Sequence, residues 1–353
     1  MTKSEFFLLA IIVSAVLLIV LFCGVIFTCA GKEKAELQAE EIIIEEPQEI
    51  EEEEIESELT EENTSPLVSH QVSRPSASLS SISSRLRGMG VNVSEIDPIN
   101  FENPDLNVLR QMGVDQYLIS FFAGEQYYKN TEYDKALAEY TASINRNNEF
   151  LEAFISRGNT WMRKRDFSRA IDDYSRAIRI DSSKAELFNY RGFARSERGE
   201  HNLAIEDFSR AISINRNYVD ALINRSHAYY QTGNYDRTIE DCDQIIRLEP
   251  SNAVIWNRRG SAWYRKEDDD KAIRDYTEAI RLNANYTLAL YNRANAYYSK
   301  RDFDKSLADL NRCLSINPSF SAAYTSRGNI FQLMGNSESA AADFAAAQRL
   351  QNR

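Results

Sequence analysis

The chain has 353 residues, of which 43% are hydrophobic and 27% are charged, and its formal net charge is −12. Residues 32–63 alone hold fifteen Glu and two Lys, which is −13, so the rest of the chain sums to +1. Such a balance lacks the basic surface of a nucleic-acid-binding protein. Four Cys and three His are too few and too scattered for a disulfide framework or a metal site, and we expect no cofactor.

Residues 6–30 form a run of 25 residues without a charge. As a helix this run is roughly 37 Å long, enough to span a hydrocarbon core of about 30 Å. The sequence therefore predicts one N-terminal transmembrane helix, which makes residues 1–31 a single-pass membrane anchor. The alternative is a lipoprotein acylated at Cys29, but Ile26, Phe27 and Thr28 precede that cysteine where a small residue is expected.

The orientation of this anchor is weakly encoded. Lys3 lies on one side, and Lys32 and Lys34 lie on the other. Acidic residues count little in orientation. We expect a short inside N-terminus and a repeat domain on the extracytoplasmic side of the membrane.

Residues 32–113 are predicted to be a disordered linker, first acidic and then rich in Ser. The many like charges repel one another and cannot bury a core. Some 80 residues of flexible chain have an r.m.s. span of about 50 Å. We interpret the segment as a solvated spacer, with an acidic docking strip or a binder of metal ions as the alternative. Near its end, a short helix is expected over Asp105–Met112, lying on or leading into the next domain.

A sequence context such as KALAEY or RAIDDY then recurs seven times at intervals of 34 residues. A period near 34 is typical of solenoids built from paired helices. The second residue of this context is Ala136, Ala170, Ala204, Thr238, Ala272, Ser306 and Ala340. Residues 114–353 therefore divide into seven helix-turn-helix repeats, with bounds 117–150, 151–184, 185–218, 219–252, 253–286, 287–320 and 321–353.

Other positions of the repeat follow the same register. The eighth position is small, which lets two helices cross closely. It is occupied by Gly124, Gly158, Gly192, Ser226, Gly260, Ala294 and Gly328. The twenty-fourth is predicted to fill the core and holds Tyr140, Tyr174, Phe208, Cys242, Tyr276, Leu310 and Phe344. Residues that suit the N-cap of the second helix are Asp134, Ser168, Asn202, Asp236, Asp270 and Asp304.

Small residues at positions eight and twenty, aromatic residues at eleven and twenty-four, and Pro250 and Pro318 at thirty-two resemble the tetratricopeptide repeat family. The resemblance covers about two-thirds of the chain. It implies an all-α, right-handed superhelical solenoid in which the first helix of each repeat lines a concave groove. Members of the family bind peptides or helices there and seldom catalyse reactions.

The seventh and twenty-third positions depart from the general family pattern. Arg occupies the seventh position and Asp the twenty-third in six repeats, whereas the first repeat has Ala123 and Glu139. The arginines are Arg157, Arg191, Arg225, Arg259, Arg293 and Arg327. The aspartates are Asp173, Asp207, Asp241, Asp275, Asp309 and Asp343. We interpret them as a structural Arg–Asp ladder, because Arg can bind a carboxylate through two hydrogen bonds; a ligand-binding Arg row is the alternative.

The family resemblance places positions two, five, nine, twelve and thirteen on the groove wall. Asn amides there can pair with a peptide backbone, and Tyr offers contact area with a polar tip. The candidate peptide-binding residues are Asn159, Arg163, Asn189, His227, Tyr230, Asn257, Tyr264, Arg265, Asn295, Tyr298 and Asn329. Members that grip a terminal carboxylate use a Lys at position five, which this chain lacks, so that clamp is not predicted.

No catalytic constellation is visible in the sequence. The three histidines are isolated, and no phosphate-binding loop or nucleophile motif is present. Cys242 and Cys313 lie two repeats apart, too far to bridge, and are expected to be buried thiols. We therefore predict a non-catalytic, membrane-tethered scaffold that binds a protein or peptide and serves assembly, folding or trafficking of a membrane complex. The alternative is a self-assembling protein that forms homo-oligomers through its Ala-rich last repeat, which carries no separate capping helix.

Overall fold

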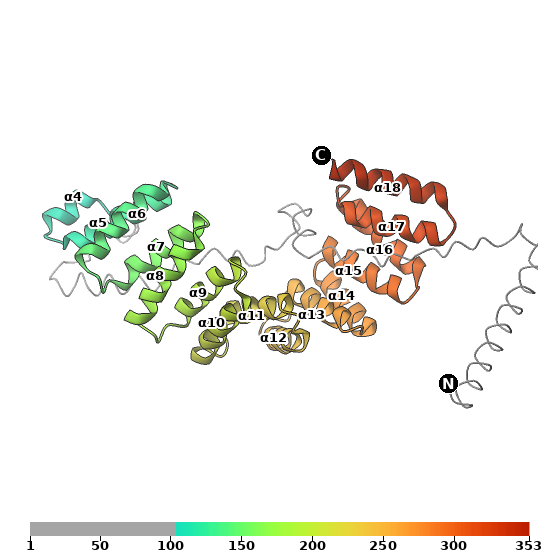
Figure 1. The fold of residues 1–353 in the computed structure, drawn as a ribbon, viewed down its shortest axis with the longest axis horizontal. Coiled ribbons are helices and arrows are strands. Elements are labelled where there is room, and N and C mark those ends of the chain that lie inside the picture. Colours follow the sequence, from blue (N-terminus) through green and yellow to red (C-terminus); the bar gives the residue numbers. More distant parts are fainter. Residues whose placement is uncertain (1–103, 353) are drawn as a thin grey trace, which may run out of the picture. The chain divides into compact units, whose positions relative to one another are not determined.

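The computed structural model describes residues 104–352, and the predicted membrane anchor and residues 32–103 of the predicted linker lie outside this range. The described residues contain fifteen α-helices and no strand. The first is α4 (Leu106–Gln111), and seven helix pairs follow it in chain order (Figure 1). The pairs are α5 (Gln116–Lys129) and α6 (Tyr133–Arg146), α7 (Leu151–Arg163) and α8 (Phe167–Ile180), α9 (Ala185–Glu197) and α10 (His201–Ile214), α11 (Val219–Gln231) and α12 (Tyr235–Leu248), α13 (Ala253–Arg265) and α14 (Asp269–Leu282), α15 (Thr287–Ser299) and α16 (Phe303–Ile316), and α17 (Ser321–Leu333) and α18 (Ser337–Gln351).

Each pair corresponds to one predicted repeat. Helices pack chiefly against the partner in their own repeat and against the adjoining helix of the next one. The all-helical solenoid predicted from the 34-residue period is confirmed. Both prolines at position thirty-two follow a helix end by two residues, since α12 ends at Leu248 and α16 at Ile316.

The core of each repeat is built from a small residue facing a large one. Gly158 on α7 lies so close to Tyr174 on α8 that a Cβ on the glycine would be 2.8 Å from the ring. Tyr174 is fully buried, as are Tyr140, Phe208 and Tyr276 at the same position of other repeats. The predicted close crossing at position eight and the predicted core filling at position twenty-four are therefore the two halves of one contact.

Helix α4 completes the N-terminal end of this row. Asp105 caps it by accepting hydrogen bonds from the backbone N–H groups of Asn107 and Val108. Leu109 is buried in the first core cluster, and the Gln126 side chain on α5 donates to the Pro104 carbonyl. The short helix expected over Asp105–Met112 is thus present and packs on the first repeat, within the last residues of the segment predicted as linker.

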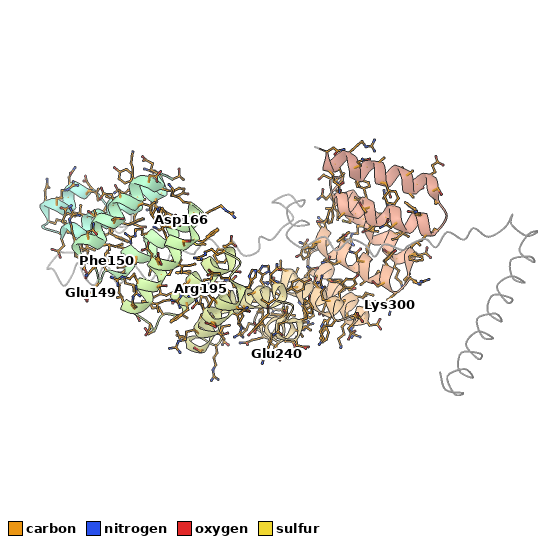
Figure 2. All side chains as sticks on the ribbon, in the orientation of Figure 1. Glu149, Phe150, Asp166, Arg195, Glu240 and Lys300 are labelled. Carbon is orange, nitrogen blue, oxygen red and sulfur yellow. The ribbon has the colours of Figure 1, made fainter. Side chains whose placement is uncertain are left out.

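The N-caps of the second helices lie two residues earlier than the sequence pattern suggested. Asp166, Asn234, Asp268, Asp302 and Asn336 accept a hydrogen bond from the backbone N–H three residues on (Figure 2 labels Asp166). The residue directly before the N-cap of each second helix adopts a left-handed backbone conformation, which makes the turn between the two helices tight. Gly199 is one of these residues, with φ 76°.

The residues first expected as caps instead lie in the first turn of the second helix. There, Asp134, Asp236 and Asp270 form ion pairs with a lysine of the next repeat: Lys164, Lys266 and Lys300, respectively (Figure 2 labels Lys300). An acidic residue is favourable in a first helical turn, so these three aspartates are also well placed for the helix dipole.

Candidate functional site

The Arg and Asp residues of the ladder are in contact in all six repeats that carry them. In each repeat the Arg Nε and Nη2 atoms donate to the two carboxylate oxygens of the Asp sixteen residues on. In repeat five, Arg259 Nε lies 2.7 Å from Asp275 Oδ2, and Nη2 lies 2.7 Å from Oδ1. The carboxylates are buried and the guanidinium groups half-buried. These two-point contacts join the two helices of one repeat.

The third nitrogen of each ladder arginine reaches the preceding repeat. Nη1 of Arg157 donates to Thr141 Oγ1 at 3.0 Å, and Nη1 of Arg259 donates to Asp243 Oδ1 at 2.6 Å. The acceptors are Thr141, Ser175, Ser209, Asp243, Thr277 and Asn311. Sequence reasoning missed this row, although a small polar residue at position twenty-five of six repeats was a visible signal. Each arginine therefore joins three helices in two repeats.

In repeat three, the ladder aspartate pairs with a second arginine as well as with the ladder arginine. Arg195 stands at position eleven, where most repeats have an aromatic residue (Figure 2). Its Nη1 lies 2.8 Å from Asp207 Oδ2, so Asp207 binds both Arg191 and Arg195. All charges of the ladder are mutually satisfied, which favours a structural role for it.

Three of the asparagines proposed for the groove are buried and already hydrogen-bonded. Asn159 accepts from the Tyr174 hydroxyl at 2.7 Å. Asn189 accepts from the Asn224 amide at 3.0 Å. Asn257 in the same way accepts from Asn292 at 3.2 Å. The Asn159 contact joins the two helices of repeat two, whereas those of Asn189 and Asn257 join the first helices of adjacent repeats. A bound peptide would have to compete for these amides.

The tyrosines at position twelve are half-buried and lie one repeat apart. Tyr230 packs on Tyr235, Tyr298 packs on Phe303, and the Tyr264 hydroxyl lies 3.3 Å from Ser299 Oγ. They come from α11, α13 and α15, the first helices of repeats four to six. The three rings are therefore held in place and still expose part of their surface.

The remaining candidates are more exposed. Arg163 donates to the Tyr128 hydroxyl at 3.3 Å, and Arg265 donates to the Tyr235 hydroxyl at 3.1 Å. Asn295 on α15 and Asn329 on α17 are half-buried. Asn295 and Asn329, together with the three tyrosines, form the surface that we call the first-helix face. It consists of Tyr230, Tyr264, Asn295, Tyr298 and Asn329.

His227, another of the predicted groove residues, lies on α11 and has one ring nitrogen without a hydrogen-bond partner in the described part of the chain. Its Nδ1 atom is sealed from solvent and has no hydrogen-bond partner among residues 104–352. Burial, assisted by the positive charge of Arg258 and by His201, lowers the pKa of His227 from 6.5 to about 3. The imidazole is thus neutral at pH 7.

This histidine makes stability depend on pH. Because the folded-state pKa lies below the unfolded value, the unfolded chain binds more protons between pH 6.5 and pH 3. The free energy of unfolding should fall as pH falls through this window, by about 2 kcal/mol at pH 5. Urea unfolding of His227→Gln should show a flatter pH profile, with His201→Gln as the matched control. Equal slopes for wild type and His227→Gln would contradict the assignment.

Arg258, next to the ladder arginine Arg259, was not singled out by the sequence. It stands at position six of repeat five and is 5% exposed. Its Nη1 donates to the Ile223 carbonyl at 3.2 Å and to Ser226 Oγ at 3.1 Å, both on α11. A signal was present in the sequence, since position six is uncharged in the other repeats.

The two described cysteines are free thiols in the core. Cys242 and Cys313 are fully buried, and no disulfide joins them. Burial raises the pKa of each thiol to about 12. We expect iodoacetamide at pH 8 to leave both unmodified in the folded protein and to label both in urea, as read by peptide mass spectrometry. Rapid labelling without urea would show that the repeats holding them open readily.

Across residues 104–352, no three His, Cys, Asp or Glu side chains are grouped so that they could hold a metal ion. In the same range, none of the helices combines the length and the apolar character needed to cross a bilayer. The transmembrane prediction concerns residues 6–30, which lie outside this range.

Models of the tetratricopeptide repeat match four stretches of the chain. They cover residues 123–185, 219–252, 253–286 and 287–320. The last three coincide with repeats four, five and six as drawn from the 34-residue period. No curated protein sequence matches the chain.

Solved structures resemble the chain in fold. A tetratricopeptide repeat protein from Parabacteroides merdae ATCC 43184 is 18% identical with a TM-score of 0.56, and the match covers 67% of this chain and 93% of that one. The C-terminal part of a TPR repeat-containing protein from Cytophaga hutchinsonii is 16% identical with a TM-score of 0.56, covering 65% and 95%. MamA is 23% identical with a TM-score of 0.47, covering 48% and 92%.

Proposed function

Because the chain is a tetratricopeptide repeat protein, we propose that it is a non-catalytic scaffold that binds a partner peptide or helix on its first-helix face. Repeats of this family commonly mediate protein–protein interaction. The proposal includes the right-handed superhelix and concave groove that the family resemblance implies, and a membrane anchor at residues 6–30.

The observation that carries this proposal is the tyrosine row on the first-helix face. Tyr230, Tyr264 and Tyr298 recur at 34-residue intervals, are half-buried, and have neighbours that hold their rings. Tyrosine supplies contact area and a hydroxyl, and a ring held in advance loses little entropy on binding. Asn295 and Asn329 add amides near this row for a peptide backbone.

Tethering is supported by the 25 uncharged residues of the segment 6–30. A tethered scaffold meets membrane-bound partners at a raised effective concentration, so modest affinity suffices. We propose that the repeats lie on the extracytoplasmic side and serve assembly, folding or trafficking of a membrane complex. An acylated Cys29 is the alternative form of the tether.

Removing residues 1–31 should release the protein from membranes into the soluble fraction, because the only long apolar run would be lost. Fractionation followed by immunoblotting measures this. Cys29→Ala is the matched control: it should leave the protein on the membrane if the segment spans the bilayer, and should release it if a lipid on Cys29 is the tether. A truncated chain that stays on the membrane would contradict both forms.

Partner capture tests the binding role. Full-length protein is cross-linked in its own membranes, and partners are identified by mass spectrometry. The triple variant Tyr264→Ala, Asn295→Ala, Tyr298→Ala should lose a partner that wild type retains. The matched control changes exposed residues of second helices, Arg274→Ala, Arg281→Ala and Ser315→Ala, and should retain it. Circular dichroism verifies that both variants stay helical. Unchanged recovery with the first variant would refute this face as the binding site.

Self-assembly through the last repeat is the second proposal, and the residues of α18 argue against it. Position twenty-eight packs against the next repeat and is Ile or Leu in the six earlier repeats, whereas it is Gln348 in repeat seven. At position twenty-five, the ladder acceptor is replaced by Ala345. Light scattering of residues 104–353 distinguishes self-assembly from partner binding alone. A monomer at all concentrations would rule out self-assembly, and a defined oligomer would support it.

A further inference from the structure

The first-helix face carries no charge at pH 7. All five of its residues stand at positions nine and twelve of their repeats, and in repeats four to seven these positions hold no Lys, Arg, Asp or Glu. The only histidine among them is neutral at this pH. A charged partner segment would meet no counter-ion at these positions, so the face favours an uncharged one. The eight residues are His227, Tyr230, Ser261, Tyr264, Asn295, Tyr298, Asn329 and Gln332.

The same positions are aromatic or polar and never aliphatic. None of the eight residues is Leu, Ile, Val or Met, whereas an amphipathic partner helix needs a hydrophobic groove for its apolar stripe. A partner strand adds to a free sheet edge, and residues 104–352 contain no strand. A polyproline II segment instead docks on aromatic side chains. Of these three backbone conformations, polyproline II is the one that the face suits.

The three tyrosines of the face present rings that are held in place. Tyr230 packs on Tyr235 with ring centroids 5.5 Å apart, and Tyr298 packs on Phe303 with centroids 5.8 Å apart. The two pairs of rings are tilted by 62° and 54°, respectively. A polyproline II segment is itself preformed, so its binding to fixed rings costs little conformational entropy.

The spacing of the tyrosines also fits polyproline II. Helices α11, α13 and α15 adjoin, since Arg258 on α13 donates to the Ile223 carbonyl on α11, and the Tyr264 hydroxyl lies 3.3 Å from Ser299 Oγ on α15. Packed helices lie about 8–10 Å apart. In polyproline II every third side chain returns to the same face after about 9.3 Å. In a strand every second one returns after about 6.6 Å, which does not match the helix spacing.

We propose that the first-helix face binds a proline-rich partner segment in the polyproline II conformation. Prolines at i, i+3 and i+6 contact Tyr230, Tyr264 and Tyr298, and the segment crosses α11, α13 and α15. Its backbone carbonyls form no internal hydrogen bonds and accept from the tyrosine hydroxyls and the Asn295 amide. This inference deepens the proposed function and rests on it, because it names the chemistry of the partner.

Binding of polyproline to the full-length protein in detergent tests the proposal. The probes are fluorescein-labelled tetraproline, heptaproline and decaproline, and anisotropy measures their affinity. Tetraproline reaches two of the three tyrosines, whereas heptaproline reaches all three and should bind about tenfold more tightly. Decaproline adds registers but no further contact, so its additional gain should be smaller. A labelled chain of ten alternating Gly and Ser residues is uncharged but flexible and should not bind.

Substitutions locate the site. Tyr264→Ala removes the central contact and should weaken heptaproline binding about tenfold, and Tyr264→Phe should weaken it less, because the ring remains. Tyr128→Ala is the matched control and should leave binding unchanged. Tyr128 also stands at position twelve and packs on Tyr133, but the next two repeats have Met162 and Ser196 there, so it belongs to no tyrosine row. Circular dichroism verifies the fold of each variant.

Three results would overturn the proposal: no binding of heptaproline, equal losses from Tyr264→Ala and Tyr128→Ala, or equal affinity for decaproline and the Gly-Ser chain. Should polyproline fail to bind while partner capture still depends on the first-helix face, the polyproline II conformation would be wrong and the scaffold function would stand. Failure of both experiments would remove the face as a binding site.

Discussion

Replacing Arg259 by Leu should lower the free energy of unfolding by about 3 kcal/mol, since removal of one partner leaves a buried charge uncompensated. Asp275 is 5% exposed, and Arg259 is its ion-pair partner. The same substitution also frees Asp243 of the preceding repeat. Urea unfolding, followed by helical circular dichroism, measures the loss.

The loss should depend on pH in a defined direction. Burial already raises the pKa of Asp275 with Arg259 opposing it, and the variant should raise it further. A folded-state pKa above the unfolded value favours the folded state at low pH and loses that advantage as pH rises. Arg259→Leu should therefore lie closer to wild type at pH 4 than at pH 7.

A second substitution distinguishes a stranded charge from lost packing. Adding Asp275→Leu to Arg259→Leu removes the uncompensated carboxylate and should recover part of the stability, giving a favourable coupling in the double-mutant cycle. If the two changes are additive, the ladder contributes no pairwise stabilisation and the interpretation is wrong. Arg274→Leu, exposed on α14, is the matched control and should change stability by less than about 0.5 kcal/mol.

Replacing Gly260 by Ala should cost about 1–3 kcal/mol, because the added methyl group would overpack the repeat core. A Cβ there would be 2.7 Å from Tyr276 Cε1 and 3.3 Å from the Ala272 carbonyl oxygen. Repeats four and six show how the chain avoids this clash. Repeat four has Ser226 at position eight and Cys242 at position twenty-four, and repeat six has Ala294 and Leu310, so a larger residue at position eight accompanies a smaller one at position twenty-four.

The pair found in repeat six predicts a rescue. Tyr276→Leu alone should destabilise repeat five by leaving a cavity, at a cost of about 2 kcal/mol or more. Combined with Gly260→Ala, it reproduces the Ala–Leu pair, and the double variant should be more stable than the sum of the two single changes predicts. Thermal unfolding measures all three. Strict additivity would contradict the view that these positions form one contact.

The period of 34 residues predicted the solenoid because each interval places the same face of a helix against its neighbour. The Arg–Asp pairs were visible for the same reason, since Arg and Asp recur together and are absent together from repeat one. The third contact of each arginine crosses to the preceding repeat, and reasoning within one repeat does not reveal it. Position twenty-five, with Thr141 in repeat one and Ala345 in repeat seven, nevertheless carried the signal.

The candidate site was harder to predict because a family position indicates which way a side chain points. It does not indicate whether that side chain is already hydrogen-bonded to another residue of the chain. Three asparagines at expected groove positions are already hydrogen-bonded to other side chains of the repeats: Asn159, Asn189 and Asn257. The roles of Asn189 and Asn257 depend on which side chains meet across a repeat boundary. Arg258 escaped notice because the only sequence signal was its place at position six, which is uncharged in the other repeats, and that signal does not reveal whether a partner is present. The structure makes that distinction.

Photo-cross-linking from the first-helix face tests the central claim most directly. A benzophenone amino acid replaces Tyr298 in the full-length protein, in its own membranes, and Ser315 on α16 carries it in the matched control. The account predicts a discrete adduct with another protein from position 298 that position 315 does not give. Equal labelling from both positions, or no protein adduct from position 298, would contradict a scaffold that binds through this face.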